Sequence, residues 1–389
     1  MTQAGGPEVE RVATVRSLDL LDTPAEERFD RIVDLARRIF DVPYAAVNLI
    51  DADRQWSKAA SGLPFAQELP LSRSFCATTV TDEGALVVPD ARADARFRDN
   101  PATVEDPGVR FYAGQPLAVD GARVGALCLV DQQPRQLTDD QLELLEELGR
   151  WAESELTRSA DMRQAAEVQR RLLPSTAPEV VGLDVAGRCV QSRGVGGDFY
   201  DWMDADGQLN VVLADVMGKG LSAAIQAAGV RATLRTTMRF NTMETALRKS
   251  SRSIAEDLDG AGAFVTAFLA RVDGRDGQVE YVDAGHGLGF VLEAEGAFRR
   301  LKDTQPPLGI DPDHPWHSRR TVLGPGDALV AVSDGYLDFI TSEAEARAAL
   351  EELGRESVSA EQIAENFISW AVDRVPLDDV SVLVVRRAA

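Results

Sequence analysis

The chain has 389 residues, of which 44% are hydrophobic and 27% are charged. These fractions are typical of globular proteins and argue against disordered and fibrous classes, and the length suggests two or three domains. With 41 Lys and Arg against 63 Asp and Glu, the formal net charge is −22. Because so acidic a surface repels phosphate backbones and anionic lipids, we expect no nucleic-acid or membrane partner.

The lack of a recognisable targeting signal and the pattern of cysteines predict a cytoplasmic protein. No apolar run approaches the roughly 20 residues of a membrane-spanning helix, and the N-terminal residues lack the basic and apolar regions of a signal peptide. Cys76, Cys128 and Cys189 lie far apart in the sequence, which excludes a disulfide scaffold and suits a reducing compartment. Three histidines without a Cys-x-x-Cys motif argue against a zinc site.

The first third of the chain reads as helix followed by strands. Apolar residues recur at helical spacing between residues 9 and 40. Apolar runs then predict strands at residues 44–50, 86–88, 111–119 and 124–130, and the Asp120-Gly121 turn predicts a hairpin between the last two. This order favours an α+β domain that ends near residue 135.

A long helix is predicted over residues 138–173. Thr138 and Gln141 have the spacing of a capping box, and Pro174 cannot continue the helix. An apolar stripe runs along its first half: Leu142, Leu145, Leu148, Ala152 and Leu156. Two interpretations stay open, namely two helices that each pack on their own domain, or a signalling helix that pairs with a second copy of the chain.

Strands and helices alternate from residue 183 onward. The pattern predicts strands at 183–190, 197–203, 209–215, 264–272, 278–283, 328–332 and 380–385, and helices at 222–240, 243–258, 343–353 and 360–372.

Four strands of this half stop at acidic residues that have glycine or other small residues beside them. The acids are Asp198, Asp215, Asp334 and the pair Asp378-Asp379. Each one alone is more often a turn or a solvated surface group. If the strand ends converge, however, the carboxylates repel one another unless a cation holds them together. Oxygen donors of this kind suit Mg²⁺, Mn²⁺ or Ca²⁺, and two such ions can activate a water for phosphate ester hydrolysis.

Residues 165–388 resemble the SpoIIE/RsbU branch of the PPM metal-dependent serine/threonine protein phosphatases. The matching motifs occur in the family's order and include residues 169–174 (QRRLLP), 195–201 (VGGDFYD), 214–224 (ADVMGKGLSAA), 283–286 (DAGH), 333–335 (SDG) and 378–381 (DDVS). The resemblance implies an α-β-β-α sandwich with a centre of two Mn²⁺ or Mg²⁺ ions between two sheets.

The resemblance also implies roles for the acidic residues. Asp215 would bridge both ions and the Val216 carbonyl would bind one. Further ligands, direct or through water, would be Asp198, Asp334 and Asp378. Asp379 is the less certain member of its pair. Asp215 and Asp334 would activate the metal-bound water. Asp201 and Asp338 are possible outer groups. Met217 stands where some relatives have histidine, so the general acid is unassigned, and His286 is expected to be structural.

Residues 9–160 resemble a GAF sensory domain, which folds as an antiparallel sheet with helices. The matching stretches include residues 51–56 (DADRQW), 72–76 (SRSFC), 87–92 (VVPDAR) and 125–128 (GALC). A ligand pocket would be lined by Trp56, Phe75, Cys76, Phe111 and Tyr112, although these residues can equally form the core. Cys76 is either a redox or chromophore-anchoring group or a small buried side chain. The resemblance names no ligand.

Together these features predict an α+β chain with a GAF-like domain at residues 1–137, a helical linker at 138–174 and a PPM-type sandwich at 175–389. The expected activity is sensor-regulated, metal-dependent hydrolysis of phosphoserine or phosphothreonine. The family context implies a phosphorylated anti-anti-sigma (STAS) protein as substrate, in bacterial stress or developmental signalling, and a homodimer. The alternative is a pseudophosphatase that binds a phosphoprotein without turnover.

Overall fold

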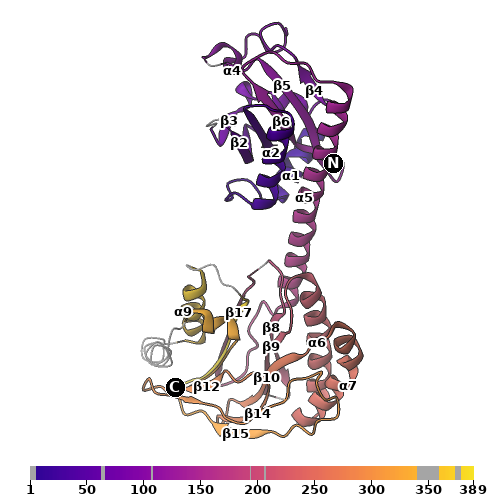
Figure 1. Ribbon diagram of the computed structural model, residues 1–389. Helices are drawn as coiled ribbons and strands as arrows, with labels where there is room; N and C mark the ends of the chain where they lie inside the picture. The colour runs from indigo at the N-terminus through magenta and orange to yellow at the C-terminus, as the bar shows by residue number, and fades with distance from the viewer. Residues whose placement is uncertain are drawn as a thin grey trace. The chain divides into compact units, whose positions relative to one another are not determined.

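The computed structural model describes residues 6–62, 66–106, 108–192, 194–205, 207–339, 359–372 and 378–389. The chain divides into two compact units, Met1–Arg163 and Gln164–Ala389. Helix α5 (Asp139–Leu172) begins in the first unit and ends in the second (Figure 1). Among the described residues, no helix has the length and apolar character that a membrane span requires.

The N-terminal unit is built on one antiparallel sheet of six strands, in the order β3-β2-β1-β6-β5-β4. Its strands are β1 (Tyr44–Ile50), β2 (Arg54–Gly62), β3 (Glu68–Pro70), β4 (Leu86–Val88), β5 (Phe111–Val119) and β6 (Ala122–Asp131). Its helices besides α5 are α1 (Pro7–Ser17), α2 (Glu27–Ile39), η1 (Leu71–Arg73), α3 (Cys76–Thr79) and α4 (Pro101–Val104). The β5–β6 hairpin turns at Asp120 and Gly121, as predicted.

The prediction of helical structure through residues 9–40 is wrong between residues 18 and 26. The helix breaks there into α1 and α2, because Asp19 and Asp22 adopt the left-handed region with φ of 50° and 58°, which a right-handed helix cannot contain. Pro24 lies in the same connection and lacks the backbone N–H that a helix interior needs.

Helix α5 is one continuous element, and its start is the predicted capping box. The Thr138 hydroxyl accepts from the Gln141 amide, and the Gln141 side chain accepts from the Thr138 amide. Four residues of the apolar stripe, Leu145, Leu148, Ala152 and Leu156, pack into the core of the N-terminal unit, where Leu148 is 6% and Leu156 0% exposed. These side chains are therefore unavailable for pairing with a second copy of the chain.

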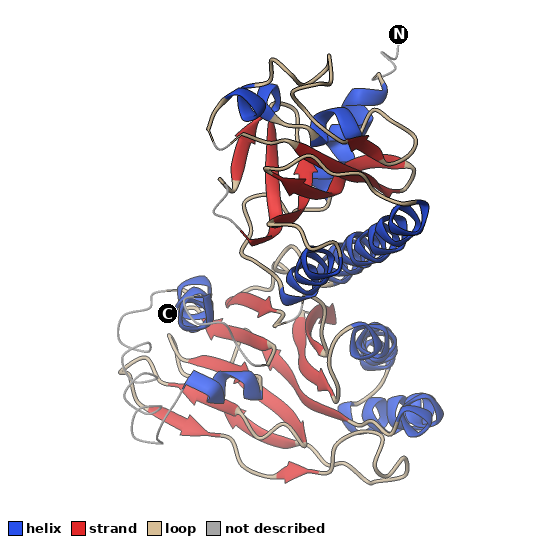
Figure 2. Ribbon diagram, turned by 45° about the horizontal axis from the view of Figure 1, so that its top comes forward, coloured by secondary structure: helices blue, strands red, loops and turns tan. Residues whose placement is uncertain are grey.

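The C-terminal unit contains two sheets (Figure 2). One has the path β14-β11-β10-β9-β8 with β15 also paired to β11, and the other has the order β13-β12-β16-β17-β7. The strands are β7 (Leu183–Val190), β8 (Asp198–Ala205), β9 (Gln208–Val216), β10 (Val265–Asp273), β11 (Gln278–Ala284), β12 (Gly289–Leu292), β13 (Phe298–Arg300), β14 (Thr304–Gln305), β15 (Arg319–Val322), β16 (Ala328–Val332) and β17 (Val380–Arg387). The helices are α6 (Leu221–Phe240), α7 (Met243–Ala261), η2 (Asp334–Phe339) and α9 (Ala360–Val372).

Three apolar clusters join these elements into four layers. One cluster lies between the first sheet and helices α6 and α7, a second lies between the two sheets, and a third joins the second sheet to α9. The layers are therefore helix, sheet, sheet and helix, which confirms the predicted sandwich. The predicted helix at 343–353 lies outside the described residues.

Candidate functional site

Asp198 and Asp215 are placed side by side by two neighbouring strands. Asp198 begins β8, Asp215 lies near the end of β9, and the two residues are direct partners in the antiparallel register. Gly197 precedes Asp198 and has no Cβ, which allows its backbone to lie close to Asp215 and Val216 on the neighbouring strand. A Cβ at Gly197 would lie 2.2 Å from the Val216 carbonyl oxygen and 3.0 Å from Asp215 Oδ1, so a larger residue would force the strands apart.

The second sheet contributes carboxylates from the ends of β16 and β17. Asp334 follows β16, while Asp378 and Asp379 precede β17. The Ser333 amide donates to the Ser381 carbonyl (2.9 Å), and the Ser381 amide donates to Ser333 Oγ (2.8 Å). These bonds hold the two strand ends together and keep the acidic residues of both segments close.

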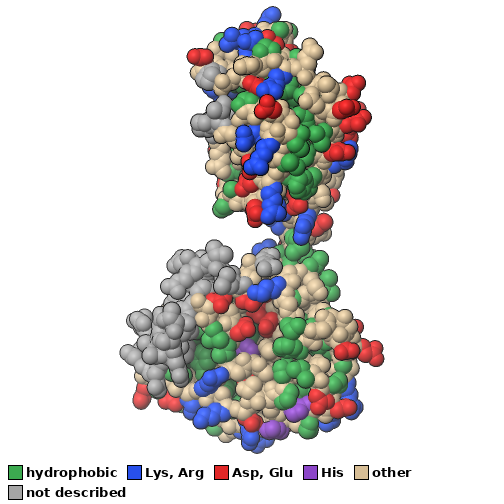
Figure 3. All heavy atoms as spheres, in the orientation of Figure 1, with side chains coloured by type: hydrophobic (Ala, Val, Ile, Leu, Met, Phe, Trp, Pro, Cys, Tyr) green, Lys and Arg blue, Asp and Glu red, His purple; other side chains and the backbone are tan. Residues whose placement is uncertain are grey.

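The carboxylates of both sheets act on one another. Burial, followed by the charge of Asp215, raises the pKa of Asp198 well above its usual value. Burial raises the pKa of Asp215 to about 7, with further increases from Asp334 and Asp378. Burial and Asp378 likewise raise the pKa of Asp334. Acidic side chains from four separate segments thus share one region of negative potential, and Figure 3 shows acidic groups gathered on this face of the C-terminal unit, near β8 and β17.

The two members of the Asp378-Asp379 pair have different surroundings. Asp378 Oδ2 forms an ion pair with Lys219 Nζ at 2.8 Å. Asp379 Oδ1 accepts from the Ser192 amide (2.9 Å) and hydroxyl (3.0 Å), and Asp379 is 7% exposed. Asp379 therefore anchors the loop after β7, while Asp378 is the more exposed carboxylate of the pair.

The donor set suits a hard divalent cation. Asp198 Oδ2 is buried and has no hydrogen-bond partner among the described residues. The neighbouring donors are carboxylates and the Val216 carbonyl, which Mg²⁺ and Mn²⁺ prefer. Within the described part of the chain, however, no three His, Cys, Asp or Glu side chains are arranged to hold a metal ion together. The donor atoms of these residues nevertheless fit such an ion chemically.

Asp201, considered as an outer group, has a structural environment. It is 0% exposed, and its carboxylate contacts Arg231 (3.1 Å) and Arg235 (2.5 Å) of α6. It therefore fastens α6 to β8. The charge of Asp338 is one of those that raise the pKa of Asp334. Burial lowers the pKa of His286 to about 4, so its ring is neutral at pH 7.

Gln169 belongs to this region, although it was not among the predicted site residues. Its side chain donates to the Gly196 carbonyl (2.7 Å) and accepts from the Gly196 amide (3.2 Å). The end of α5 thereby holds the loop that leads into Asp198. The QRRLLP motif marks this residue in the sequence, but a glutamine gives no sign of which backbone it contacts.

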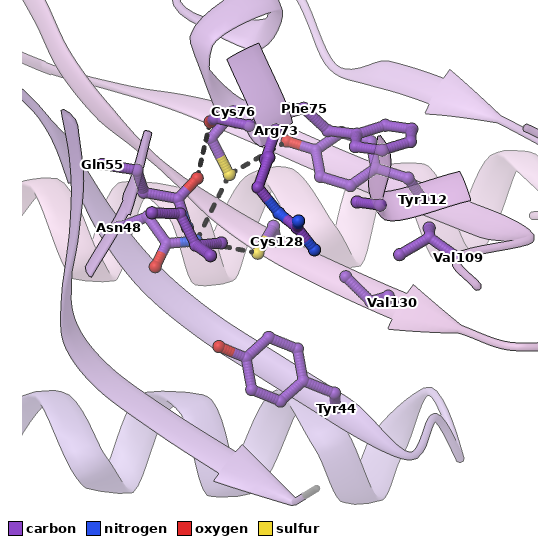
Figure 4. Close-up of a pocket in the computed structure, with 13 residues that line it drawn as sticks. Tyr44, Asn48, Gln55, Arg73, Phe75, Cys76, Val109, Tyr112, Cys128 and Val130 are labelled. Carbon is purple, nitrogen blue, oxygen red and sulfur yellow. Dashed lines mark hydrogen bonds between the residues drawn. The ribbon is translucent and has the colours of Figure 1, made fainter. Parts of the chain in front are cut away.

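A separate pocket lies in the N-terminal unit, on the side of the sheet that faces α3 (Figure 4). Of the five predicted lining residues, it includes Phe75, Cys76 and Tyr112. Phe111 lies on the opposite face of β5, in the cluster with α2 and α5, because adjacent strand residues point to opposite faces. Trp56 does not line this pocket, and its ring lies 5.5 Å from the Arg54 guanidinium.

Comparisons with known proteins agree with both folds. Residues 205–388 match the family model of stage II sporulation protein E (SpoIIE), and residues 24–156 match that of the GAF domain. These matches identify a GAF domain and a SpoIIE-type domain in the chain. Two solved structures share the fold of the SpoIIE-type domain. The PP2C domain of SiaA from Pseudomonas aeruginosa has a TM-score of 0.53 and 20% identity and covers 60% of this chain and 99% of its own. The RsbU and RsbW domains of a Mycobacterium tuberculosis protein have a TM-score of 0.50 and 24% identity. That match covers 56% of this chain and 64% of the other.

Three curated relatives are similar to parts of the chain. A cyclic di-GMP phosphodiesterase of Pseudomonas aeruginosa is 41% identical over 142 residues, which are 36% of this chain and 24% of that protein. Protein IcfG of Synechocystis sp. is 26% identical over 262 residues, or 58% and 41% of the two chains. Phosphoserine phosphatase RsbU of Bacillus subtilis is 27% identical over 235 residues, or 59% and 70%. The chain thus spans less than half of the first two relatives.

Proposed function

We propose that this GAF–SpoIIE chain is a metal-dependent phosphatase that hydrolyses phosphoserine or phosphothreonine on a protein. The observation that supports this most directly is that Asp198, Asp215, Asp334 and Asp378 come from four strand ends of two sheets. Neighbouring carboxylates add to the raised pKa of Asp198, Asp215 and Asp334, and one buried Asp198 oxygen has no hydrogen-bond partner among the described residues. Such a cluster is costly unless it serves a cation.

Two Mn²⁺ or Mg²⁺ ions would supply Lewis acidity and a hydroxide-like water at neutral pH. We assign Asp215 the central position, since it neighbours Asp198 on one side and is influenced by Asp334 and Asp378 on the other. The carbonyl of Val216 is a further donor. Asp379 is assigned as the anchor of the loop around Ser192 rather than as a ligand, because Ser192 already occupies one of its oxygens.

We extend this proposal to the substrate of the phosphatase and to its regulation. RsbU is named a phosphoserine phosphatase, and its similarity supports a phosphorylated STAS-type anti-anti-sigma protein as the substrate here. The GAF unit would bind a signal. Helix α5, whose last turns include Gln169 bonded to Gly196 next to Asp198, would pass the change to the site. A cytoplasmic location and a homodimer remain predictions.

A pseudophosphatase is the second candidate. It is favoured by the lack of any three potential ligands held together within the described residues. Such a protein would hold a phosphoprotein without releasing phosphate.

Phosphate release from a phosphoserine STAS-type protein distinguishes the two candidates. We expect release with Mn²⁺, none with EDTA, and none from Asp215→Asn. Asp204→Asn, an exposed acid on the same strand as Asp198, should retain the activity. Retained binding without release in folded wild-type chain at saturating Mn²⁺ would support the pseudophosphatase, and release that survives EDTA would refute the metal mechanism.

A further inference from the structure

Two cysteines distant in sequence meet in the pocket of the N-terminal unit. Cys76 begins α3, Cys128 lies within β6, and each is 2% exposed. One amide group touches both, because Asn48 Nδ2 lies 3.3 Å from Cys76 Sγ and 3.2 Å from Cys128 Sγ. Figure 4 shows both bonds as dashed lines that run from this amide to the two sulfur atoms.

The Asn48 amide is itself held in place. Its Oδ1 accepts a hydrogen bond from Ser57 Oγ at 2.7 Å, so both N–H groups are free to point at the sulfur atoms. Cys128 lies opposite Ala46 in the β1–β6 register. Because Ala46 is two residues before Asn48 in β1, the side chains of Asn48 and Cys128 lie on the same face of the sheet. The strands thus fix Asn48 and Cys128, and α3 brings Cys76 to them.

The two thiols have unequal acidity. Cys76 Sγ also accepts from the Tyr112 hydroxyl at 3.3 Å. The hydrogen bond from Cys128, with those of Tyr112 and Asn48, lowers the pKa of Cys76, while the bond with Cys76 and burial raise that of Cys128. Burial keeps Tyr112 a neutral donor, since its pKa is raised. Cys76 is thus the better nucleophile, and Cys128 retains its proton.

Both sulfur atoms line a pocket with an open mouth. Its cavity volume is about 40 Å³, which leaves room for a molecule as small as hydrogen peroxide. Its other lining groups include Gln55 and Arg73 at the polar side and Val109 and Val130 at the apolar side.

We propose that Cys76 and Cys128 form a peroxide-reactive dithiol that closes to an intramolecular disulfide inside this pocket. The Cys76 thiolate attacks one oxygen of a hydroperoxide and breaks its O–O bond, which gives a sulfenic acid and, after protonation, water or an alcohol. The Cys128 sulfur then attacks the Cys76 sulfur and displaces hydroxide, which takes up the Cys128 proton and leaves as water. Two thiols are oxidised and one hydroperoxide is reduced.

The proposal is tested by treating the reduced full-length chain with a small excess of hydrogen peroxide. We expect loss of two of the three thiols, a mass lower by two hydrogens, and a peptide that links Cys76 to Cys128, all reversed by dithiothreitol. Cys189 in the C-terminal unit is the internal control. Burial raises its pKa, so it should react at least about tenfold more slowly.

Two variants separate the steps. In Cys128→Ser, Cys76 should stop at the sulfenic acid, which dimedone traps, whereas Cys189→Ser should behave as the wild-type chain. If Cys128→Ser does not fold, the peptide map of the wild-type chain still decides. Retention of the Cys76 and Cys128 thiols in the folded chain, a bond to Cys189, or a bond between two chains would overturn the proposal. None of these readouts depends on phosphatase activity.

Discussion

Asp215, the central residue of the site that we propose, occupies an environment that costs stability. Its pKa of about 7 arises from burial and from neighbouring carboxylates, so in the absence of a cation its ionisation opposes folding. A group with a raised folded-state pKa stabilises the fold below its unfolded pKa and loses that contribution as pH rises through the folded value.

We therefore expect the metal-free chain to lose stability between about pH 5.5 and pH 8. The shift of Asp215 corresponds to a loss of roughly 2 kcal/mol over this range. Urea unfolding of the C-terminal unit in EDTA measures it, and Asp215→Asn, which removes the titrating group, should flatten the dependence by that amount. An equal slope in both proteins would contradict the environment described for Asp215.

Asp201 has the opposite role, since it stabilises the fold through two arginines. In Asp201→Asn the guanidinium of Arg231, whose side chain is 14% exposed, loses its counter-charge in a largely buried position. We expect the free energy of unfolding to fall by about 2–3 kcal/mol. The control Asp204→Asn should change it by less than about 1 kcal/mol. A loss of metal binding with unchanged stability would instead place Asp201 in the site.

At the scale of elements, the end of α5 determines how firmly the loop before Asp198 is held. Gln169→Ala leaves the amide and carbonyl of Gly196 without their partner, which costs about 1–3 kcal/mol. We expect weaker Mn²⁺ binding, because the loop that positions Asp198 loosens. Arg170→Ala, at an exposed neighbouring position, is the matched control and should bind Mn²⁺ as the wild-type chain does.

Elements with uniform apolar character could be predicted from the sequence, and those without it could not. Strands β1, β5 and β16 and helix α9 have the predicted limits, because their buried faces give continuous or periodic patterns. Strand β2, with the sequence RQWSKAASG, was missed because its residues are mostly polar or small and it is defined by pairing with β1. The same limit applies to the site. The strand-end acids are visible in the sequence, whereas the contacts of Gln169, Lys219 and Ser192 depend on tertiary structure.

At the scale of the whole molecule, the two units have separate cores. The apolar clusters of the GAF unit contain no residue of the C-terminal unit, and the reverse also holds for the described residues. We expect two transitions in calorimetric unfolding. Saturating Mn²⁺ should raise only the midpoint of the C-terminal unit, by roughly 5 °C at a concentration of about 100 times Kd. A single transition that Mn²⁺ shifts as a whole would contradict independent cores.

We propose that the strand-end carboxylates of the C-terminal unit form a divalent-metal site. Titration calorimetry of the full-length chain with Mn²⁺ measures binding to this site. We predict saturable binding to the wild-type chain that is weakened at least about tenfold in Asp215→Asn and preserved in Asp204→Asn. Equal binding by the wild-type chain and Asp215→Asn, or no binding by folded wild-type chain, would contradict the claim.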